Sequence, residues 1–214
     1  MIITESTSVR YVHVVLLFSL VAVFIWSAIK PYQLGTWFLE VTPLVVGVAL
    51  TIFGYRRFRL TTLAYIFVWL GSVVVLIGGH YTYGRVPLFE LLKSIVGSNR
   101  NYYDRFGHFI FGMVVALIVR EFLLRKSPLR PGKLLIILNL GLSLSLSALY
   151  ELSEWAVGLF MGSAAEAFLG LQGDIWDTHW DMFLALLGAI SFLLIFSKIH
   201  NRYLTKEIGF YPLI

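Results

Sequence analysis

Acidic side chains recur in pairs at helical spacing inside or beside long apolar stretches of this sequence. Asp177 and Asp181 are four residues apart, and Glu151 and Glu154 are three apart, so within helices each pair shares a face. Carboxylates packed together repel one another and must either be protonated or bind cations. With one or two imidazoles they form a ligand set for a hard or borderline divalent metal ion. The spacing therefore predicts a divalent metal site in a helical bundle.

Eight residues are candidates for this site. Five carboxylates are the expected metal ligands: Glu151, Glu154, Asp174, Asp177 and Asp181. Three further residues are expected to act as catalytic acid–base groups or as additional ligands: Asp104, His108 and His80. Helical phase places the three aspartates at 174, 177 and 181 within an arc of about 60°, whereas His179 points elsewhere. Glu40 opens an apolar segment on the same side of the membrane.

Each candidate also has a structural interpretation. Asp104 and Asp174 can be helix caps, and His80 can be an interfacial histidine. Capping does not explain the carboxylates inside apolar segments, because a charge at membrane depth costs about 2.5–3.5 kcal/mol on insertion scales. We expect Arg105 and Arg120 to be the nearby cations, and carboxylates outnumber them. A purely structural ion-pair network remains the alternative to a metal.

Six long apolar segments must position these residues. Hydrophobic residues make up 58% of the chain and charged residues 14%, with a mean hydropathy of +0.82; soluble domains are about 45–50% apolar and about 25% charged. The segments are 11–29, 36–54, 60–80, 106–124, 134–158 and 178–197. Each is long enough to cross about 30 Å of hydrocarbon. We therefore predict an all-α bundle of about six transmembrane helices that forms a single domain, 1–214. The amphipathic stretch near 86–97 is expected to be a short interfacial or re-entrant segment.

Lysine and arginine placement predicts the orientation. With the N-terminus inside, eleven basic residues fall in inside loops: Arg10, Arg56, Arg57, Arg59, Arg125, Lys126, Arg130, Lys133, Lys198, Arg202 and Lys206. Five fall in outside loops: Lys30, Arg85, Lys93, Arg100 and Arg105. This asymmetry satisfies the positive-inside rule. Both termini are therefore predicted in the cytoplasm, and the acidic cluster at the outer boundary of the membrane.

Several functional classes are excluded by composition and motifs. The chain has no cysteine, which excludes thiolate metal sites and thiol catalysis. The net charge of +5 belongs to short loops, where it suits anionic lipid headgroups rather than nucleic acid. No P-loop, GxSxG or HExxH motif is present. Membrane lipids are the expected partners, and the sequence predicts no oligomeric state.

Four stretches carry a resemblance to a known family. They are GHYTYGRVP (79–87), YDRFGHFIFG (103–112) with VREFL (119–123), ALYELSEW (148–155) and LQGDIWDTHWDMFLALLGA (171–189). In these motifs, which cover about half of the chain, the sequence resembles the YjdF-like inner-membrane proteins of bacteria. The resemblance implies a small multi-pass protein of the bacterial cytoplasmic membrane, and it implies no particular activity.

Two functions fit the residues. The first is a membrane-embedded metalloenzyme in which a divalent metal ion activates water or polarises a phosphoryl or acyl group of a lipid-like substrate. The second is a carrier of protons or cations that uses the same carboxylates. The position at one membrane boundary favours the enzyme, because carrier sites are expected near the midplane between repeated halves. A non-catalytic assembly protein is a third alternative, and no feature of the sequence favours it.

Overall fold

The computed structural model describes residues 7–161, 168 and 171–212, and no strand occurs among them. The helices are α1 (Thr7–Ala28), α2 (Leu34–Gly54), α3 (Thr62–Tyr81), α4 (Pro87–Val96), α5 (Tyr103–Lys126), α6 (Lys133–Met161), α8 (Asp177–Ile195), α9 (Ser197–Tyr203) and the π-helical turn η2 (Leu204–Ile208). Within these described ranges, six helices are long and apolar enough to cross a membrane: α1, α2, α3, α5, α6 and α8. Each overlaps one of the predicted segments, so the predicted all-α bundle is confirmed. The short segment predicted near 86–97 is α4.

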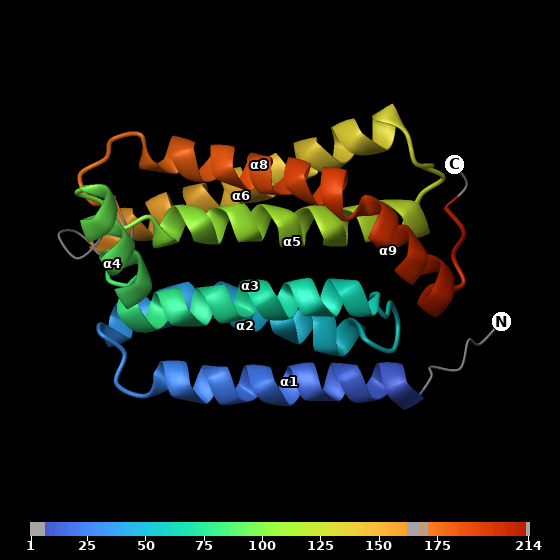
Figure 1. Cartoon of the computed structure of the whole chain (residues 1–214), viewed down its shortest axis with the longest axis horizontal. Coiled ribbons are helices and arrows are strands. Elements are labelled where there is room, and N and C mark those ends of the chain that lie inside the picture. Colours follow the sequence, from blue (N-terminus) through green and yellow to red (C-terminus); the bar gives the residue numbers. More distant parts are fainter. Residues whose placement is uncertain (1–6, 162–167, 169–170, 213–214) are drawn as a thin grey trace.

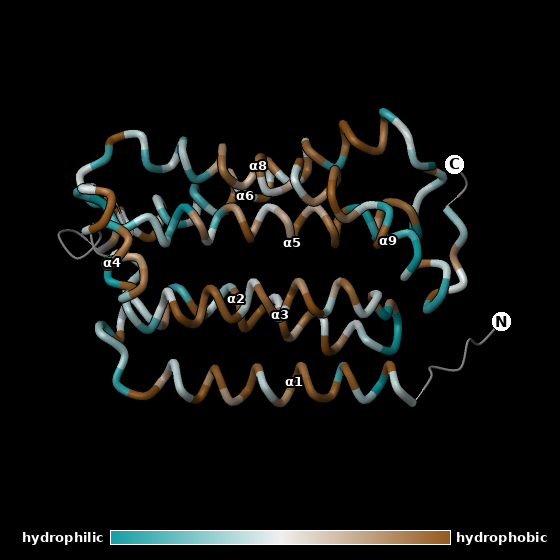
Figure 2. Tube along the Cα trace, viewed as in Figure 1, coloured by the Kyte–Doolittle hydropathy of each residue, from teal (hydrophilic) through white to brown (hydrophobic). Residues whose placement is uncertain are grey.

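The long helices lie side by side along one axis, and the two ends of the bundle differ (Figure 1). The terminal end carries the first turn of α1, the α2–α3 and α5–α6 turns, and α9 (Figure 1). The acidic end carries the α1–α2 turn, α4 and the segment that leads into α8. Hydrophobic residues occupy most of the helix length between the two ends (Figure 2). The side of the membrane that each end faces remains the prediction made from lysine and arginine placement.

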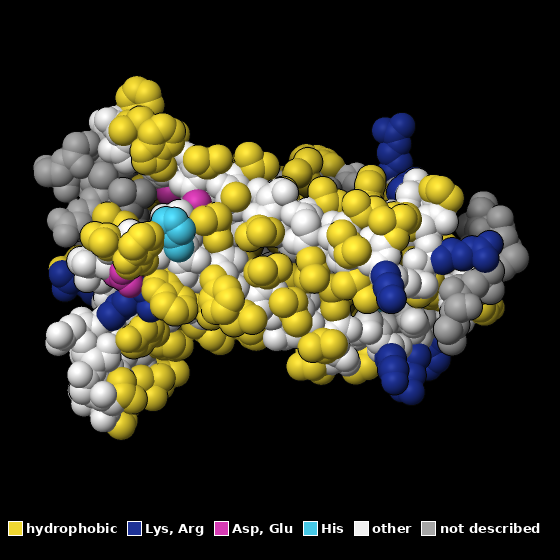
Figure 3. Space-filling model, turned by 90° about the horizontal axis from the view of Figure 1, so that it is seen from above, with side chains coloured by type: hydrophobic (Ala, Val, Ile, Leu, Met, Phe, Trp, Pro, Cys, Tyr) yellow, Lys and Arg dark blue, Asp and Glu magenta, His cyan; other side chains and the backbone are white. Residues whose placement is uncertain are grey.

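The outer surface of the bundle suits lipid. Large apolar side chains such as Phe18, Phe53 and Leu194 are more than two-thirds exposed, and hydrophobic side chains cover much of the surface in Figure 3. Lysine and arginine side chains project from the terminal end in the same view. In hydrocarbon the backbone must bond within each segment, as it does in these helices.

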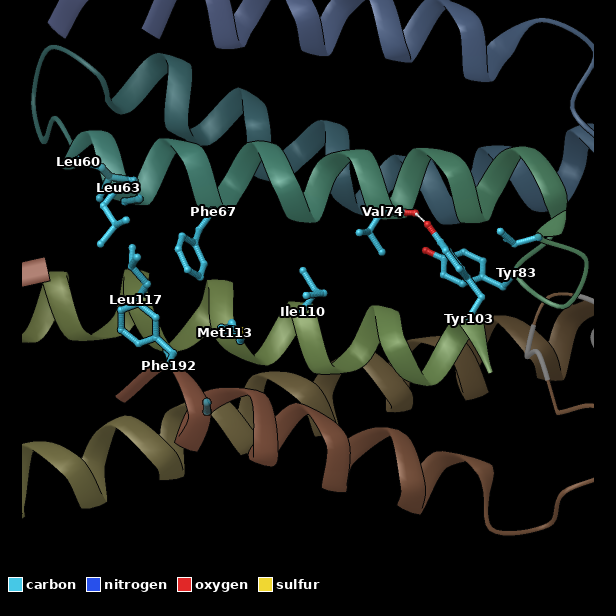
Figure 4. Packing of buried hydrophobic residues seen from close by; sticks show 14 residues of the cluster. Leu60, Leu63, Phe67, Val74, Tyr83, Tyr103, Ile110, Met113, Leu117 and Phe192 are labelled. Atoms are coloured by element: carbon cyan, nitrogen blue, oxygen red, sulfur yellow. Dashed lines mark hydrogen bonds between the residues drawn. The ribbon is translucent and has the colours of Figure 1, made fainter. Parts of the chain in front are cut away.

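The main core lies between α3, α5 and α8 (Figure 4). Phe67 of α3 packs edge-on against Phe192 of α8, with ring centres 5.6 Å apart, and Leu117 of α5 is fully buried in the same cluster. Near the acidic end, the hydroxyl of Tyr103 donates a hydrogen bond to the carbonyl of Val74 at 2.9 Å. Helix α5 is thus the central element, with α3, α6 and α8 packed around it.

The backbones of α5 and α8 approach closely because glycine stands at both contact points. A Cβ atom on Gly112 would overlap the carbonyl group of Ala185, and one on Gly188 would overlap the carbonyl group of Phe109. Small residues allow such close approach of membrane helices.

This contact sets the register of the site. Both helices begin at the acidic end, so they run parallel. The contact places Gly112 and Ala185 at the same level along the bundle axis. His108 and Asp181 lie one helical turn from this level toward the acidic end. Asp104 and Asp177 lie one turn further in the same direction. The α5–α8 contact therefore holds two pairs of polar side chains level with each other.

We predict that Gly112→Ala lowers stability by about 1–3 kcal/mol, because the added methyl group must push α8 away from α5. The measurement is the melting temperature of the purified protein in detergent. Gly141→Ala is the matched control, since nothing lies within 4 Å of a Cβ at that helical glycine; it should melt at or above the temperature of the unmodified protein. Equal melting of the two variants would contradict the tight contact.

Candidate metal centre at the acidic end

Three helices bring three potential metal ligands together. His108 of α5, Glu151 of α6 and Asp181 of α8 each offer one donor atom, and these atoms all lie within 4.8 Å of one another. His108 Nε2 lies 3.5 Å from Glu151 Oε1, and all three residues are buried. In a tetrahedral zinc site with ligand distances of about 2.0–2.2 Å, ligand atoms lie roughly 3.3–3.6 Å from one another. A small inward movement of the side chains would therefore suffice for coordination.

A second group of acids shares Asp181 with the first. Donor atoms of Asp104, Asp177 and Asp181 also lie within 4.8 Å of one another, and Asp104 Oδ1 lies 3.7 Å from the Nε2 atom of His108. The parallel register of α5 and α8 explains this, since both pairs of positions are four residues apart. The two groups together form one polar layer, which we call the acidic layer: Asp104, His108, Glu151, Asp177 and Asp181.

Several oxygens in the acidic layer have no hydrogen-bond donor within the described part of the chain. These atoms are Glu151 Oε1, Asp181 Oδ1 and Asp177 Oδ2, and the exposed fractions of their residues are 6%, 3% and 2%. Buried polar atoms are nearly always paired, and an isolated buried carboxylate is very unfavourable. Such oxygens can be satisfied by a bound cation or by protons.

Two arginines neutralise part of this charge. Arg100 forms an ion pair with Asp177 and donates a hydrogen bond to the carbonyl of Leu171 at 2.8 Å. Arg105 contacts the carboxylate of Asp174 at 2.5 Å, and its Nη2 atom lies 3.7 Å from Asp177 Oδ1. Arg100, which the sequence prediction did not include in the site, is 7% exposed. It ties the start of α8 to the loop that precedes α5.

Paired amides join the loop before α5 to the approach to α8. The backbone N–H of Asn101 donates to Gln172 Oε1 at 2.9 Å, and the Gln172 side chain donates to the Asn101 carbonyl at 3.0 Å. Asn101 Nδ2 also donates to Glu90 of α4 at 2.9 Å. Gln172 and Gly173 adopt left-handed backbone conformations, with φ of 45° and 80°, which turn the chain sharply into α8. The loop, α4 and the approach to α8 are thereby linked.

The structure places Asp174 differently from the prediction. The helix begins only at Asp177, so the predicted common helical face for Asp174, Asp177 and Asp181 is wrong for Asp174. Its Oδ1 atom accepts a hydrogen bond from the backbone N–H of Trp176 at 2.9 Å. This bond and the Arg105 guanidinium hold the pKa of Asp174 below its usual range.

Two other candidates stand apart from the two ligand groups. His80 Nδ1 lies 3.0 Å from the carbonyl oxygen of Ser27, and its ring stacks on Trp26 with centres 4.6 Å apart, so these contacts direct it toward α1. Glu154 is half-buried and lies close enough to Glu40 and Glu151 for their like charges to repel.

Glu40 extends the acidic region onto α2. Its exposed fraction is 5%, and Tyr150 Oη lies 3.5 Å from its carboxylate. Burial, together with the Glu40 charge, raises the pKa of Tyr83 well above its usual range. The position of Glu40 near the start of its apolar segment correctly predicted that it lies at the acidic end. The sequence around Tyr150 has no feature that predicts its contact with Glu40.

The prediction that Arg120 is a cation near the acidic cluster is wrong. Arg120 lies sixteen residues beyond Asp104 on α5, about 24 Å further along the helix. Its guanidinium donates to His200 Nδ1 at 2.9 Å and to Asn201 at 2.7 Å. Because arginine only donates, Nδ1 accepts, and burial lowers the pKa of His200.

A buried carboxylate at the terminal end, Glu121, has all its oxygens paired. It accepts from the Thr61 hydroxyl at 2.8 Å and from its backbone N–H at 3.0 Å. His200 Nε2 lies 3.1 Å away, and Arg125 donates at 2.6 Å. This network was not predicted, because a single Glu next to an Arg near the end of an apolar segment carries no distinctive spacing.

Comparisons with known proteins agree with this architecture. Residues 12–202 match the family described as "Predicted membrane protein (DUF2238)". The chain belongs to this family. It is also similar to the "Inner membrane protein YjdF" of Escherichia coli (strain K12), with 40% identity over 188 residues that cover 88% of this chain and 90% of the relative. No solved structure matches the chain.

Family membership confirms the resemblance drawn from the four motifs. With six apolar helices and an inner-membrane relative, this member of the family is a multi-pass protein of the inner membrane.

Arg100→Gln should lower stability by about 3–5 kcal/mol, because it leaves the buried Asp177 with only the more distant Arg105, 3.7 Å away, as a counter-charge among the described residues. The melting temperature in detergent measures this. Arg85→Gln is the control on the other side of α4: Arg85 is exposed and its guanidinium lies over the face of the Tyr32 ring at 4.3 Å, so its effect should stay within about 1 kcal/mol. Adding Asp177→Asn to Arg100→Gln should recover part of the loss; no recovery would show that Arg100 acts through other contacts.

Proposed function

We propose that this membrane protein binds a divalent metal ion in the acidic layer, between His108, Glu151 and Asp181. One observation carries the proposal: buried carboxylate oxygens converge from two helices on an imidazole of a third, and they accept no hydrogen bond from the described residues. A cation would satisfy these oxygens and offset the repulsion between the carboxylates.

The terminal-end network supports a cation rather than a structural role. At Glu121 the fold supplies hydrogen-bond donors to both carboxylate oxygens. At Glu151 and Asp181 one oxygen of each carboxylate, Oε1 and Oδ1 respectively, has no hydrogen-bond partner in the described chain and faces other ligand atoms instead, although the Glu151 carboxylate accepts a hydrogen bond from Thr178. A purely structural network would be expected to pair these atoms, since each unpaired buried group costs about 1–3 kcal/mol or more.

The ligand types narrow the choice of metal. One imidazole with carboxylates suits the borderline ion Zn²⁺, and the carboxylate majority also suits the harder first-row ion Mn²⁺, whereas Mg²⁺ and Ca²⁺ prefer oxygen alone. Asp104 and Asp177 would stand beside the ion as further carboxylates. Asp177 is already bound by Arg100, so Asp104 is the better candidate for an additional ligand or an acid–base group.

A metal-dependent reaction on a lipid-like substrate is the function that this site supports best. A bound divalent ion would polarise a phosphoryl or acyl group, or lower the pKa of a water molecule. The acidic layer lies at one end of the bundle rather than at mid-depth. Beside the acidic layer, Trp176 just before α8 and Trp180 in its first turn are exposed. Exposed tryptophans are typical of the membrane interface. Substrate headgroups would occupy the same level.

The proposal predicts that purified protein dialysed against Zn²⁺ or Mn²⁺ retains about one ion per chain. Asp181→Asn and His108→Ala should each lower retention at least about tenfold, because loss of one ligand from a three-ligand set weakens chelation. Elemental analysis measures the content. His179→Ala is the control, since His179 is exposed on the same helix as Asp181.

Chelation supplies an independent readout of the same prediction. Removing the ion should lower the melting temperature, because binding to the folded state stabilises it and its loss leaves like charges facing one another. Unchanged melting, together with no retained metal in the unmodified protein, would refute the metal site and favour protonated carboxylates.

A second function, transport of protons or cations, is favoured by one feature of α6. Asn139, Ser143, Ser147 and Glu151 are spaced four apart on one face and are all buried. Ser143 Oγ, Ser147 Oγ and Asn139 Oδ1 accept no hydrogen bond and find no partner within the described chain. This row of four side chains, which we call the α6 file, runs about 18 Å along the helix from the acidic layer toward the terminal end. Water bridging these groups would form a polar path.

If the α6 file conducts, protein reconstituted in liposomes should dissipate an imposed pH gradient, as read by an entrapped pH-sensitive dye. Ser147→Leu should abolish the flux, because it replaces a polar group in the file by a bulky apolar one. Ser145→Leu is the control, since Ser145 is exposed and bonds to its own helix. Flux equal to that of empty liposomes would leave the enzyme as the surviving candidate.

A further inference from the structure

A cleft separates α1 from α2 in the terminal half of the bundle. Its volume is about 460 Å³, within the range of ligand pockets. Its walls come from residues 10–20 of α1, 48–56 at the end of α2 and in the turn after it, and 65–69 of α3, and most of its lining is apolar. None of the metal-site candidates lies in it.

The cleft follows from how the first two helices pack. Both α1 and α2 lie against α3, and they meet each other at the acidic end. There Trp37 of α2 donates to Ser27 of α1 at 2.9 Å and packs on Phe24. Pro43 stands between this contact and the half of α2 that lines the cleft; a proline inside a helix removes a hydrogen bond and bends it.

Hydrogen bonds fix both ends of the cleft. At the deep end, Trp69 of α3 donates to Ser19 of α1 at 2.9 Å. At the shallow end, the His13 ring lies 2.7 Å from the Tyr55 hydroxyl and 2.9 Å from that of Thr62. These contacts hold α1 at a set distance from α2 and α3, so the cleft is preformed.

The depth of the cleft matches one membrane leaflet. Its α1 wall runs from Arg10 to Leu20, which at 1.5 Å per residue is about 15 Å. Half of the hydrocarbon thickness is also about 15 Å. An acyl chain that enters at the level of Arg10 would therefore end near the middle of the membrane, beside Leu20 and Trp69.

Positive charge lies at the mouth of the cleft. Arg10 and Arg56 line it there, both are exposed, and neither has an ion-pair partner among the residues that the structure describes. Guanidinium groups bind phosphate with paired, charge-assisted hydrogen bonds. The mouth thus complements an anionic headgroup, and the interior complements hydrocarbon.

We propose that this cleft is a binding site for one anionic phospholipid, with an acyl chain between α1 and α2 and the phosphate at Arg10 and Arg56. The site is independent of the proposed metal centre, because it lies at the opposite end of the bundle and shares no residue with it. If the lipid is bound there, the position of α1 depends on which phospholipids the leaflet on that side contains.

The test is native mass spectrometry of the detergent-purified protein titrated with phosphatidylglycerol or with phosphatidylcholine. One phosphatidylglycerol per chain should be retained in preference to phosphatidylcholine. The double substitution Arg10→Gln, Arg56→Gln should weaken phosphatidylglycerol binding by about tenfold or more. Arg57→Gln is the charge control, because Arg57 is exposed in the same turn and does not line the cleft.

A second pair of variants tests the hydrocarbon part. Val14→Trp should fill the cleft and displace both lipids, whereas Val12→Trp, on an exposed position of α1 outside the cleft, should not. Equal retention of the two lipids with no effect of the arginine substitutions would overturn the proposal. So would efficient disulfide dimerisation through Leu17→Cys in liposomes, which this cysteine-free chain permits as a clean assay, because it would place a second copy on the cleft.

Discussion

Electrostatic repulsion among buried carboxylates is the constraint to which the acidic end of this protein must conform. Glu151, Asp177 and Asp181 are each at least nine-tenths buried, and Arg100 and Arg105 are the arginines paired with acids there in the described structure. Like charges so close in a medium of low polarity cannot all remain ionised without further cations. The α5–α8 backbone contact adds to this crowding, because it holds Asp104 of α5 level with Asp177 and Asp181 of α8.

The two ends of the bundle deal with buried charge in different ways. At the terminal end, Thr61, Arg125 and His200 surround Glu121 with donors, so the carboxylate is fully paired and serves to join α3, α5 and α9. At the acidic end, the fold pairs Asp177 with Arg100 and links the neighbouring loop by paired amides, yet leaves oxygens of Glu151 and Asp181 without a hydrogen-bond partner in the described chain. This contrast within one chain is the basis on which we propose a ligand at the acidic end.

Much of the architecture could be predicted from the sequence, because long apolar segments have few ways to fold in a membrane. The common face of Asp177 and Asp181 also followed from helical spacing. Residues outside regular helices could not be placed in this way. Asp174 lies in a turn whose left-handed conformations at 172–173 precede the helix, and Arg100 lies in a loop without periodicity. Arg120 lies at the other end of the bundle because α5 is 24 residues long and carries it sixteen residues, about 24 Å, beyond Asp104.

X-ray absorption at the metal K edge of Zn²⁺-loaded protein tests most directly whether the acidic layer is a metal site. The first coordination shell should contain nitrogen and oxygen ligands at about 2.0–2.2 Å, with the outer-shell scattering of an imidazole. His108→Ala should remove the imidazole signal, and His179→Ala should leave it unchanged. A spectrum without imidazole scattering, or one that responds equally to both substitutions, would contradict a metal held between His108, Glu151 and Asp181.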